Sequence, residues 1–554
     1  MVMKAFPWLQ RIRAAIVLLL FALIPGLPTL GQNRLDLLFA YGSEKEEWIT
    51  EATAAFNRAG IKATDGRTIV VKALPMGSGE CMDRVASGSL KAQLVSPASG
   101  LFIKLANSES RTKTGKDLVP ETENLVLSPV VIAVWKPMAE ALGWGNKPVG
   151  WAEILALARN PEGWGALNAP QWGQFKLGHT HPEYSNSGLI SILAETYAAT
   201  GKTAGLSLED IGRPEVGEFV HGIEGSIVHY GASTGFFGKK MFQQGPGYLS
   251  AAVLYENMVV EANSGKYSLP FPVVAVYPKE GTFWSDHPVG VVDAAWVTSE
   301  QKAAARRYIR FLLAPEQQRR ALAFGFRPGL VDVALGAPID KAHGVDPAEP
   351  KTTLEVPRAE VIRGVGRLWE KSKKHSRVVL VMDTSGSMND GGRIENARKG
   401  AAQMLRLMKD EDTFSLLSFN SRLTWAMRSQ PLTQGRTLAE KTIASLWANG
   451  GTALYDAILA AHEDLQKAPD NEKISAVVVL TDGQDTNSKT ALETLMKAIR
   501  FDSEKNNVRV FTIGYGEDAN REVLQKIADS TQAKSYAGTP ENIESVFKDI
   551  STFF

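Results

Sequence analysis

Apolar runs of strand length alternate with helix-like segments along most of the chain. Residues 35–40 read as a buried strand, and residues 44–59 follow with apolar positions spaced as on a helix. The same plan returns late in the chain, with strongly apolar strands at 377–382 and 474–480. Strands that alternate with helices form mostly parallel sheets covered by helices. We therefore expect an α/β protein.

A change in composition divides this pattern into two parts. Between about residues 336 and 376 the chain is polar and contains four prolines, and its last part reads as one amphipathic helix. Before it, residues 300–325 read as a single helix that ends at Gly325. The expected parts are an N-terminal segment over 1–32, a two-lobed α/β module over 33–335, a linker with a connecting helix over 336–375, and a second α/β domain over 376–554.

Composition narrows the classes of function. The chain has 554 residues, 44% hydrophobic and 22% charged, with a net charge of +1. No strong global field attracts nucleic acid, so we expect no nucleic-acid partner. Cys81 is the only cysteine, which excludes an intramolecular disulfide and argues against a thiolate zinc site. We interpret Cys81 as a buried packing residue.

The N-terminus has the layout of a secretory signal. Lys4, Arg11 and Arg13 precede a short apolar run, which Pro25 and Gly26 interrupt. The apolar run is shorter than the roughly 20 residues of an obvious membrane-spanning helix. No clear cleavage site follows, so an uncleaved anchor stays open. We expect an exported protein, periplasmic or extracellular, with tethering by this segment as an alternative.

Three separated segments carry oxygen-bearing side chains at expected strand ends or helix starts. The first runs from Asp383 to Ser387 after an apolar strand, the second includes Thr452 before a helix, and the third includes Asp482 after another apolar strand. Parallel α/β sheets gather ligands at the carboxyl ends of strands, so the segments can converge. Hydroxyl and carboxylate oxygens suit Mg²⁺ or Ca²⁺ and suit zinc or copper badly.

The motif Asp383-x-Ser385-x-Ser387, with Thr452 and with Asp482-Gly483, resembles the metal-ion-dependent adhesion site of von Willebrand factor type A domains. The resemblance runs from about Ser376 to the C-terminus and implies a Rossmann-like domain. It implies that Ser385 and Ser387 bind the ion directly, and that Thr452, Asp383 and Asp482 bind it directly or through water. We expect Mg²⁺, with Ca²⁺ or Mn²⁺ as alternatives. An acidic residue of a partner protein would complete the site.

The first part of the chain resembles type 2 extracellular solute-binding proteins, which have two lobes. The resemblance covers roughly residues 33–335 and rests on loops such as Tyr41-Gly42-Ser43, Gly77-Ser78-Gly79 and Tyr277-Pro278-Lys279. Serines in Gly/Ser loops at helix starts can bind a small polar solute or oxyanion together with the helix N–H groups. The candidates, each of which is as well explained by helix capping, are Ser43, Ser78, Ser99, Ser187 and Ser233.

Three further readings stay open. A delivery subunit of an ABC-type importer would dock on a membrane permease. The run from Gly231 to Gly235 matches the G-x-S-x-G pattern of serine hydrolases, with Ser233 as nucleophile and Asp286 and His287 downstream. We favour a binding protein over this enzyme, because neighbouring residues rarely orient as acid and base. His179 and His181 share a face on a strand and could bind zinc, but no third ligand is apparent.

Overall fold

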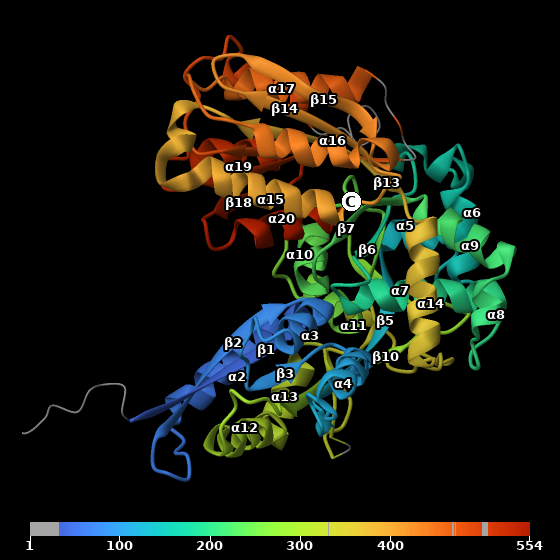
Figure 1. Ribbon diagram of the computed structural model, residues 1–554. Helices are drawn as coiled ribbons and strands as arrows, with labels where there is room; N and C mark the ends of the chain where they lie inside the picture. Colours follow the sequence, from blue (N-terminus) through green and yellow to red (C-terminus); the bar gives the residue numbers. More distant parts are fainter. Residues whose placement is uncertain (1–32, 331, 468–469, 471–472, 501–507, 554) are drawn as a thin grey trace, which may run out of the picture.

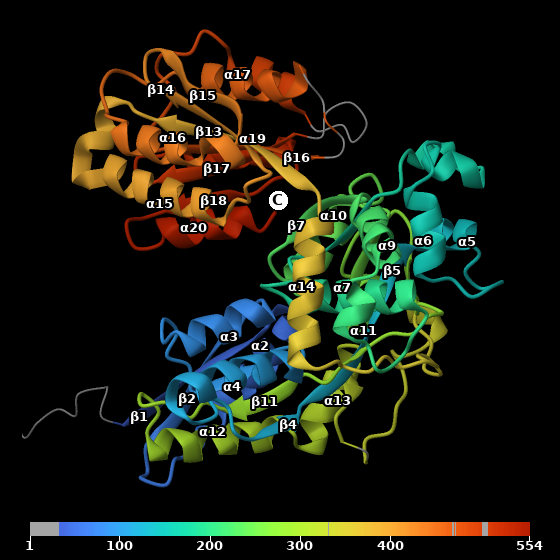
Figure 2. The same cartoon turned by 45° about the vertical axis from the view of Figure 1, so that its right-hand side comes forward.

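The computed structural model describes residues 33–330, 332–467, 470, 473–500 and 508–553. Figure 1 shows three sheet-containing units, one at each end of the molecule and one between them. The chain begins in the first unit, forms the middle one, returns to the first at residues 288–323 and ends in the third. The connecting helix α14 (Ala359–Ser372) runs along the middle unit and leads into the C-terminal unit (Figure 2). The signal-like segment predicted at residues 1–32 lies outside the described residues.

The first sheet is built around the parallel pair formed by β1 and β2, with β3 parallel on the other side of β1. Its strands, in spatial order, are β2 (Thr68–Met76), β1 (Arg34–Gly42), β3 (Leu94–Ser96), β11 (Pro288–Val291) and β4 (Thr122–Asn124). Its helices are α2 (Glu46–Arg58), α3 (Ser78–Ala86), α4 (Gly100–Thr114), α12 (Ser299–Leu312) and α13 (Pro315–Ala323). Cys81 is fully buried in α3, as predicted.

The second sheet is mixed, because β5 pairs antiparallel with β8 and β9 while β6 runs parallel to β7 and β8. Its main path is β10 (Trp284–Ser285), β5 (Val126–Trp135), β8 (Ala251–Tyr255), β6 (Leu177–Thr180) and β7 (Ile227–Gly231), with β9 (Val273–Val276) and β12 (Arg327–Pro328) also on β5. Its helices are α5 (Lys136–Leu142), α6 (Trp151–Ala158), α7 (Asn186–Thr200), α8 (Leu208–Ile211), α9 (Pro214–Glu224), α10 (Thr234–Gln244) and α11 (Glu256–Asn263).

The third sheet is parallel except for its edge strand β15. Its order is β15 (Leu423–Pro431), β14 (Thr413–Phe419), β13 (His375–Asp383), β16 (Lys473–Thr481), β17 (Arg509–Tyr515) and β18 (Ser535–Gly538). Its helices are α15 (Arg393–Leu407), α16 (Leu432–Ser445), α17 (Leu454–Lys467), α18 (Leu492–Ile499), α19 (Arg521–Ser530) and α20 (Ile543–Ser551). Val379 and Val381 pack on one face, and Val378 and Leu380 on the other. The strands are continuously apolar because both faces are buried.

The helix predicted over residues 300–325 is two helices, so that prediction was wrong. The break falls at Pro315, the first residue of α13. A proline ring disfavours the helical conformation of the residue before it, and Ala314 is extended, with φ −62° and ψ 143°. Proline fits the first position of a helix because no intrahelical partner is needed for its missing N–H.

The proline-rich stretch before α14 packs against the second sheet rather than hanging free. Ile339, Val345 and Leu354 are buried there. The Arg327 guanidinium donates to the backbone carbonyls of Asp346, Pro347 and Glu349 and forms an ion pair with the buried Glu256. This stretch therefore holds the start of α14 against the second unit.

The second and third units share a hydrophobic core that also takes in α14. At their junction, Lys240 Nζ donates to the carbonyl of Gln532 at 2.6 Å, and the backbone N–H of Tyr230 donates to the carbonyl of Phe553 at 3.3 Å. The ring of Phe553 packs 5.8 Å from that of His229. The C-terminal unit is thus fixed against the N-terminal module by apolar and polar contacts.

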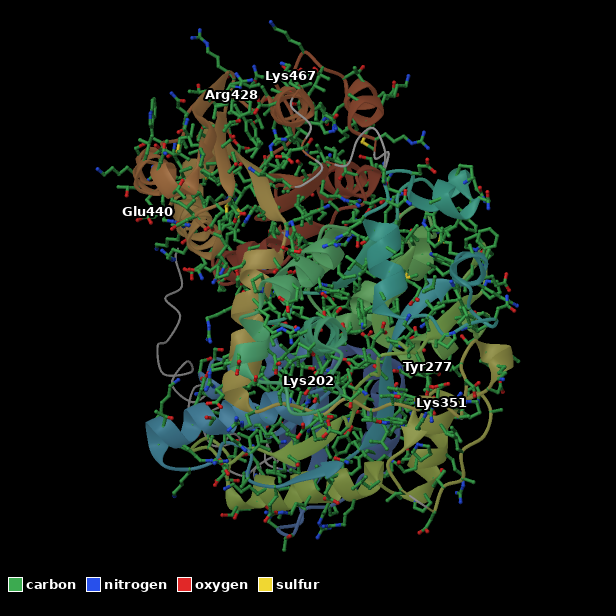
Figure 3. All side chains as sticks on the ribbon, turned by 90° about the vertical axis from the view of Figure 1, so that its right-hand side faces the viewer. Lys202, Tyr277, Lys351, Arg428, Glu440 and Lys467 are labelled. Carbon is green, nitrogen blue, oxygen red and sulfur yellow. The ribbon has the colours of Figure 1, made fainter. Side chains whose placement is uncertain are left out.

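Figure 3 shows the labelled side chains of Arg428, Glu440 and Lys467 on the C-terminal unit, away from Lys202 and Tyr277 of the middle one. Among the residues that the structure describes, no helix has the length and apolar character needed to cross a membrane.

Candidate metal centre

The predicted metal-binding residues lie at one edge of the third sheet. Asp383 is the last residue of β13, and Asp482 directly follows β16. These two strands are hydrogen-bonded neighbours that run parallel, so their carboxyl ends meet at the same edge. Ser385 directly precedes the 3-10 helix η5 (Gly386–Gly392) that follows β13, Ser387 is the second residue of η5, and Thr452 lies two residues before α17.

Hydrogen bonds connect four of these five residues in a chain. The backbone N–H of Ser385 donates to Asp383 Oδ1 at 2.7 Å, and the hydroxyls of Ser385 and Ser387 are 3.1 Å apart. Ser387 Oγ donates to Asp482 Oδ1 at 2.8 Å. Thr452 lies beside them, because a Cβ added to Gly483 would be 3.8 Å from Thr452 Oγ1 and 4.0 Å from Ser387 Oγ. The structure therefore brings all five predicted residues together.

Backbone contacts hold the three segments in place. The N–H of Gly386 donates to the carbonyl of Gly450 at 2.9 Å, which joins the first segment to the second. The N–H groups of Thr486 and Asn487 donate to the carbonyl of Thr452, which joins the second to the third. Asp485 Oδ1 accepts from the N–H of Leu454 at 2.8 Å and so caps α17. The loop after Asp482 thus positions Thr452.

Two further residues, Thr481 and Arg393, contact the site and were not predicted from the sequence. Thr481 Oγ1 donates to Asp383 Oδ2 at 2.5 Å, and the guanidinium of Arg393 donates to Asp482 Oδ2 at 2.8 Å and to Asp518 Oδ2 at 2.9 Å. Thr481 could have been found, since it directly precedes Asp482. Arg393 begins α15 and has no sequence signal that connects it to Asp482, which is 89 positions later.

The arrangement fits a hard divalent cation. Asp383 and Asp482 are fully buried, Ser385 and Thr452 nearly so, and Ser387 is half-buried. Burial raises the pKa of Asp383 to about 6, hydrogen bonds from Thr481 and Ser385 oppose the rise, and the nearby Asp482 adds to it. Two carboxylates and three hydroxyls offer only oxygen ligands, and a divalent ion would offset the charge of the paired carboxylates.

The five serines predicted for a solute lie in the first two units, all buried. Ser43 and Ser233 meet between the first and second sheets, with their Oγ atoms 2.9 Å apart. Ser187 Oγ bonds Thr180 and Thr234, Ser78 Oγ accepts from the N–H of Ala98, and Ser99 Oγ caps α4. The structure thus brings Ser43 and Ser233 together, and each of the five serine hydroxyls has a hydrogen-bond partner within the chain.

The helix N–H groups near these serines also have partners in the chain. The N–H groups of Gly79 and Glu80, at the start of α3, both donate to the carbonyl of Tyr184 from the second unit. The N–H of Gly235 donates to Ser43 Oγ, and that of Gly100 to Asp286 Oδ1. A Cβ added to Gly77 would lie 2.3 Å from the Tyr184 carbonyl oxygen, so the two units pack backbone to backbone here.

A buried group of charges lies at the same junction and was also missed by the sequence analysis. Lys45 Nζ is 2.5 Å from Glu44 Oε1 and 3.1 Å from His287 Nδ1, and all three residues are buried. Burial raises the pKa of Glu44, but the Lys45 ammonium and His287 outweigh it, so the pKa falls to about 2. The junction therefore contains its own cation.

The three residues considered for a serine hydrolase do not form a catalytic triad. Ser233 Oγ contacts Ser43, Asp286 accepts from Gly100, and His287 Nδ1 contacts Lys45 and Glu44. The geometry gives that alternative no support. The two histidines considered for zinc have different partners: the ring of His181 packs 4.8 Å from that of Trp369, while His179 Nε2 lies 2.8 Å from Glu224 Oε1.

Family models match both parts of the chain. The model of bacterial extracellular solute-binding proteins matches residues 37–327, and that of the von Willebrand factor type A domain matches residues 378–551. The chain belongs to the bacterial extracellular solute-binding protein family and carries a von Willebrand factor type A domain at its C-terminal end. Both are binding domains, and the first indicates an exported or periplasmic protein.

Relatives match one or both parts. An uncharacterized protein of Mycobacterium tuberculosis is 22% identical over 82% of this chain and 66% of its own length. An uncharacterized protein of Synechocystis is 27% identical over 32% of this chain and 43% of its own. Bovine inter-alpha-trypsin inhibitor heavy chain H4 is 32% identical over 27% of this chain and 17% of its own. The chain therefore spans less than two thirds of the length of these relatives.

Solved structures resemble each part separately. A periplasmic thiamin binding protein has a TM-score of 0.44 at 16% identity and covers 63% of this chain and 99% of its own. The sulfate-binding protein SubI of Mycobacterium tuberculosis has a TM-score of 0.37 at 20% identity, over 57% and 93%. A von Willebrand factor type A protein from Catenulispora acidiphila has a TM-score of 0.28 at 24% identity, over 32% and 42%.

Proposed function

We propose that this protein is an exported binding protein that engages an acidic side chain of a partner protein through a Mg²⁺ ion. Asp383, Ser385, Ser387, Thr452 and Asp482 would hold the ion. One observation carries the proposal: three segments that are far apart in the sequence place these five oxygen-bearing side chains together at the carboxyl ends of β13 and β16.

The chemistry of the partner follows from the ligand set. Mg²⁺ prefers six oxygen ligands in octahedral geometry, and hydroxyls add no negative charge. The two carboxylates are partly compensated, since Asp482 also pairs with Arg393. A bound ion therefore keeps positive character toward the exterior and favours a carboxylate from outside. When bound, the ion would supply that attraction, while the protein's own groups orient it.

Metal-dependent capture tests this proposal. The full chain, Ser385→Ala and Ser445→Ala would be immobilised and exposed to envelope extract with Mg²⁺ or with chelator. Ser445 is an exposed hydroxyl on α16, outside the site, and is the matched control. We expect a protein that the wild type and Ser445→Ala retain only with Mg²⁺, and that Ser385→Ala does not retain. Retention that is equal in all three, with or without Mg²⁺, would contradict the proposal.

A second candidate is that the N-terminal module captures a small polar solute or oxyanion, alone or for a permease. The family match over residues 37–327 favours it, as do the starts of α3 and α10, which converge on the junction of the two units. Here a solute would have to separate Ser43 from Ser233 and replace the Tyr184 carbonyl at α3. Calorimetry with sulfate, phosphate and thiamin tests it: saturable binding that Ser43→Ala weakens supports it, and no heat with any of them contradicts it for these probes.

A further inference from the structure

A second group of metal-ligating side chains lies deep in the middle unit, apart from the site above. His179 on β6, Glu195 on α7 and Glu224 at the end of α9 are all fully buried. One ligand atom from each lies within 4.8 Å of the others. Buried carboxylates are costly unless each is paired with a cation or a hydrogen-bond donor, so the contacts of each residue show what this group lacks.

His179 presents a lone pair to the group. Its Nδ1 lies 2.8 Å from the carbonyl oxygen of Thr180, which can only accept, so Nδ1 carries the proton. In the neutral ring Nε2 is then an acceptor, and it lies 2.8 Å from Glu224 Oε1, another acceptor. Two acceptors at this distance need a proton or a metal ion between them. A histidine whose other nitrogen donates to a carbonyl has the orientation of a metal ligand.

Glu224 is held in one orientation by donors on its other oxygen. Glu224 Oε2 accepts from the hydroxyl of Tyr230 at 2.7 Å and from the indole N–H of Trp369 at 2.9 Å. Both donors leave Oε1 directed at His179. Outer hydrogen bonds of this kind fix ligating carboxylates in metal sites.

Glu195 supplies the independent observation that a ligand is missing. Its Oε1 accepts from Ser191 at 2.9 Å, while its fully buried Oε2 has no hydrogen-bond partner among the described residues. Burial raises the pKa of Glu195 well above its usual range, and the charge of Glu224 adds to the rise. No cationic side chain contributes to that balance.

We propose that His179, Glu195 and Glu224 bind a zinc ion that stabilises the middle unit beneath the connecting helix. One neutral imidazole and two carboxylates neutralise a divalent ion, which removes the charge imbalance of the buried group. Ligands at about 2.0–2.2 Å from zinc lie roughly 3.3–3.6 Å apart in a tetrahedron, which small rotations of these side chains reach. Through Trp369, the same ion would support α14, which leads to β13.

Zinc and cobalt binding to the full chain test this proposal. The background is Ser385→Ala, so that the candidate Mg²⁺ centre does not contribute. In it, Glu195→Gln keeps the size of the side chain and its Ser191 contact, and Glu218→Gln, an exposed residue on α9, is the matched control. Bound zinc would be measured by mass spectrometry after dialysis, and cobalt by its visible absorption, which is intense for tetrahedral sites and weak for octahedral ones.

We expect the background and Glu218→Gln to retain one zinc per chain and to give the tetrahedral cobalt spectrum. Glu195→Gln should bind zinc at least about tenfold more weakly, and a chelator should lower the melting temperature of the background but not of Glu195→Gln. No bound zinc and no tetrahedral cobalt spectrum in the background would overturn the proposal and leave a proton shared between the side chains. Equal zinc binding by Glu195→Gln and Glu218→Gln would overturn it too. If Glu195→Gln fails to fold, the cobalt spectrum of the Ser385→Ala protein tests the proposal alone: a tetrahedral spectrum supports it, and the lack of one overturns it.

Discussion

Serine hydroxyls occur both at the carboxyl edge of the third sheet and at the junction between the first two units, but their surroundings differ. Both regions place serine hydroxyls where strands end and helices start. At the edge, the hydroxyls of Ser385 and Ser387 face two carboxylates. At the junction, Ser43 and Ser233 bond each other, and the buried charge of Glu44 is matched by Lys45. The two sets of loops thus differ mainly in the charge that surrounds their hydroxyls: paired carboxylates at the edge, and a carboxylate matched by an ammonium at the junction.

The largest effect on the free energy of unfolding is expected at Lys45, the buried cation of the junction. Lys45→Met would leave Glu44 buried without its ammonium partner, which should lower the free energy of unfolding by about 3–5 kcal/mol. Urea denaturation measures it. Lys113→Met, at an exposed lysine on α4, is the control and should change it by less than about 0.5 kcal/mol. Equal effects of the two substitutions would show that the junction does not depend on its internal cation.

The pH dependence of stability should show the same charge pairing. The pKa of Glu44 is lowered to about 2 in the folded protein, against 4.5 as its ordinary value. Its stabilisation is therefore fully present above about pH 4.5 and is lost as the pH falls from 4.5 toward 2, by roughly 3 kcal/mol in total. Denaturation of the wild type and of Glu44→Gln across this range measures it. A stability that falls equally steeply in Glu44→Gln would contradict the pairing.

Substitutions at the edge of the third sheet and at the junction should affect metal affinity differently. Ser385→Ala removes a proposed ligand and should weaken Mn²⁺ binding about 10–100-fold, whereas Ser43→Ala should leave it unchanged. Titration of Mn²⁺ followed by electron paramagnetic resonance measures both. If Ser43→Ala weakened Mn²⁺ binding as much as Ser385→Ala, the ion would not distinguish the edge of the third sheet from the junction.

The smallest effect is expected at a serine that acts only as a helix cap. Ser99 Oγ accepts from the N–H of Leu101 at the start of α4, so Ser99→Ala should cost about 1 kcal/mol in the free energy of unfolding. Urea denaturation measures the cost, and calorimetry with sulfate measures any binding. Loss of sulfate binding in Ser99→Ala would give this serine a role beyond capping.

The sequence predicted the strands of the third sheet and the residues that meet at its carboxyl edge for a physical reason. Strands buried on both faces are continuously apolar, and the residues from Asp383 to Ser387 directly follow one of them, so local patterns reveal both. The break at Pro315 was also visible in principle, because proline at the start of a helix excludes one continuous helix.

Other features depend on contacts between residues far apart in the chain. Glu44 and Lys45 contact His287, which follows more than 240 positions later in the chain. Arg393, at the start of α15, contacts Asp482, which follows β16. Glu195 comes within reach of His179 only once α7 packs on the second sheet. No periodicity or short motif encodes such pairs, so single-sequence reasoning found neither the junction's cation nor the two glutamates, Glu195 and Glu224, that lie beside His179.

In the proposed metal centre, five side chains from three segments hold one divalent ion at the edge of the third sheet. Diffraction from crystals of the full chain grown with Mn²⁺, measured at the manganese absorption edge, would locate this ion. We expect an anomalous peak within about 2.1–2.3 Å of the Oγ atoms of Ser385 and Ser387, and no such peak in Ser385→Ala crystals. Wild-type crystals with no peak at this edge, or with an equal peak after the substitution, would contradict it.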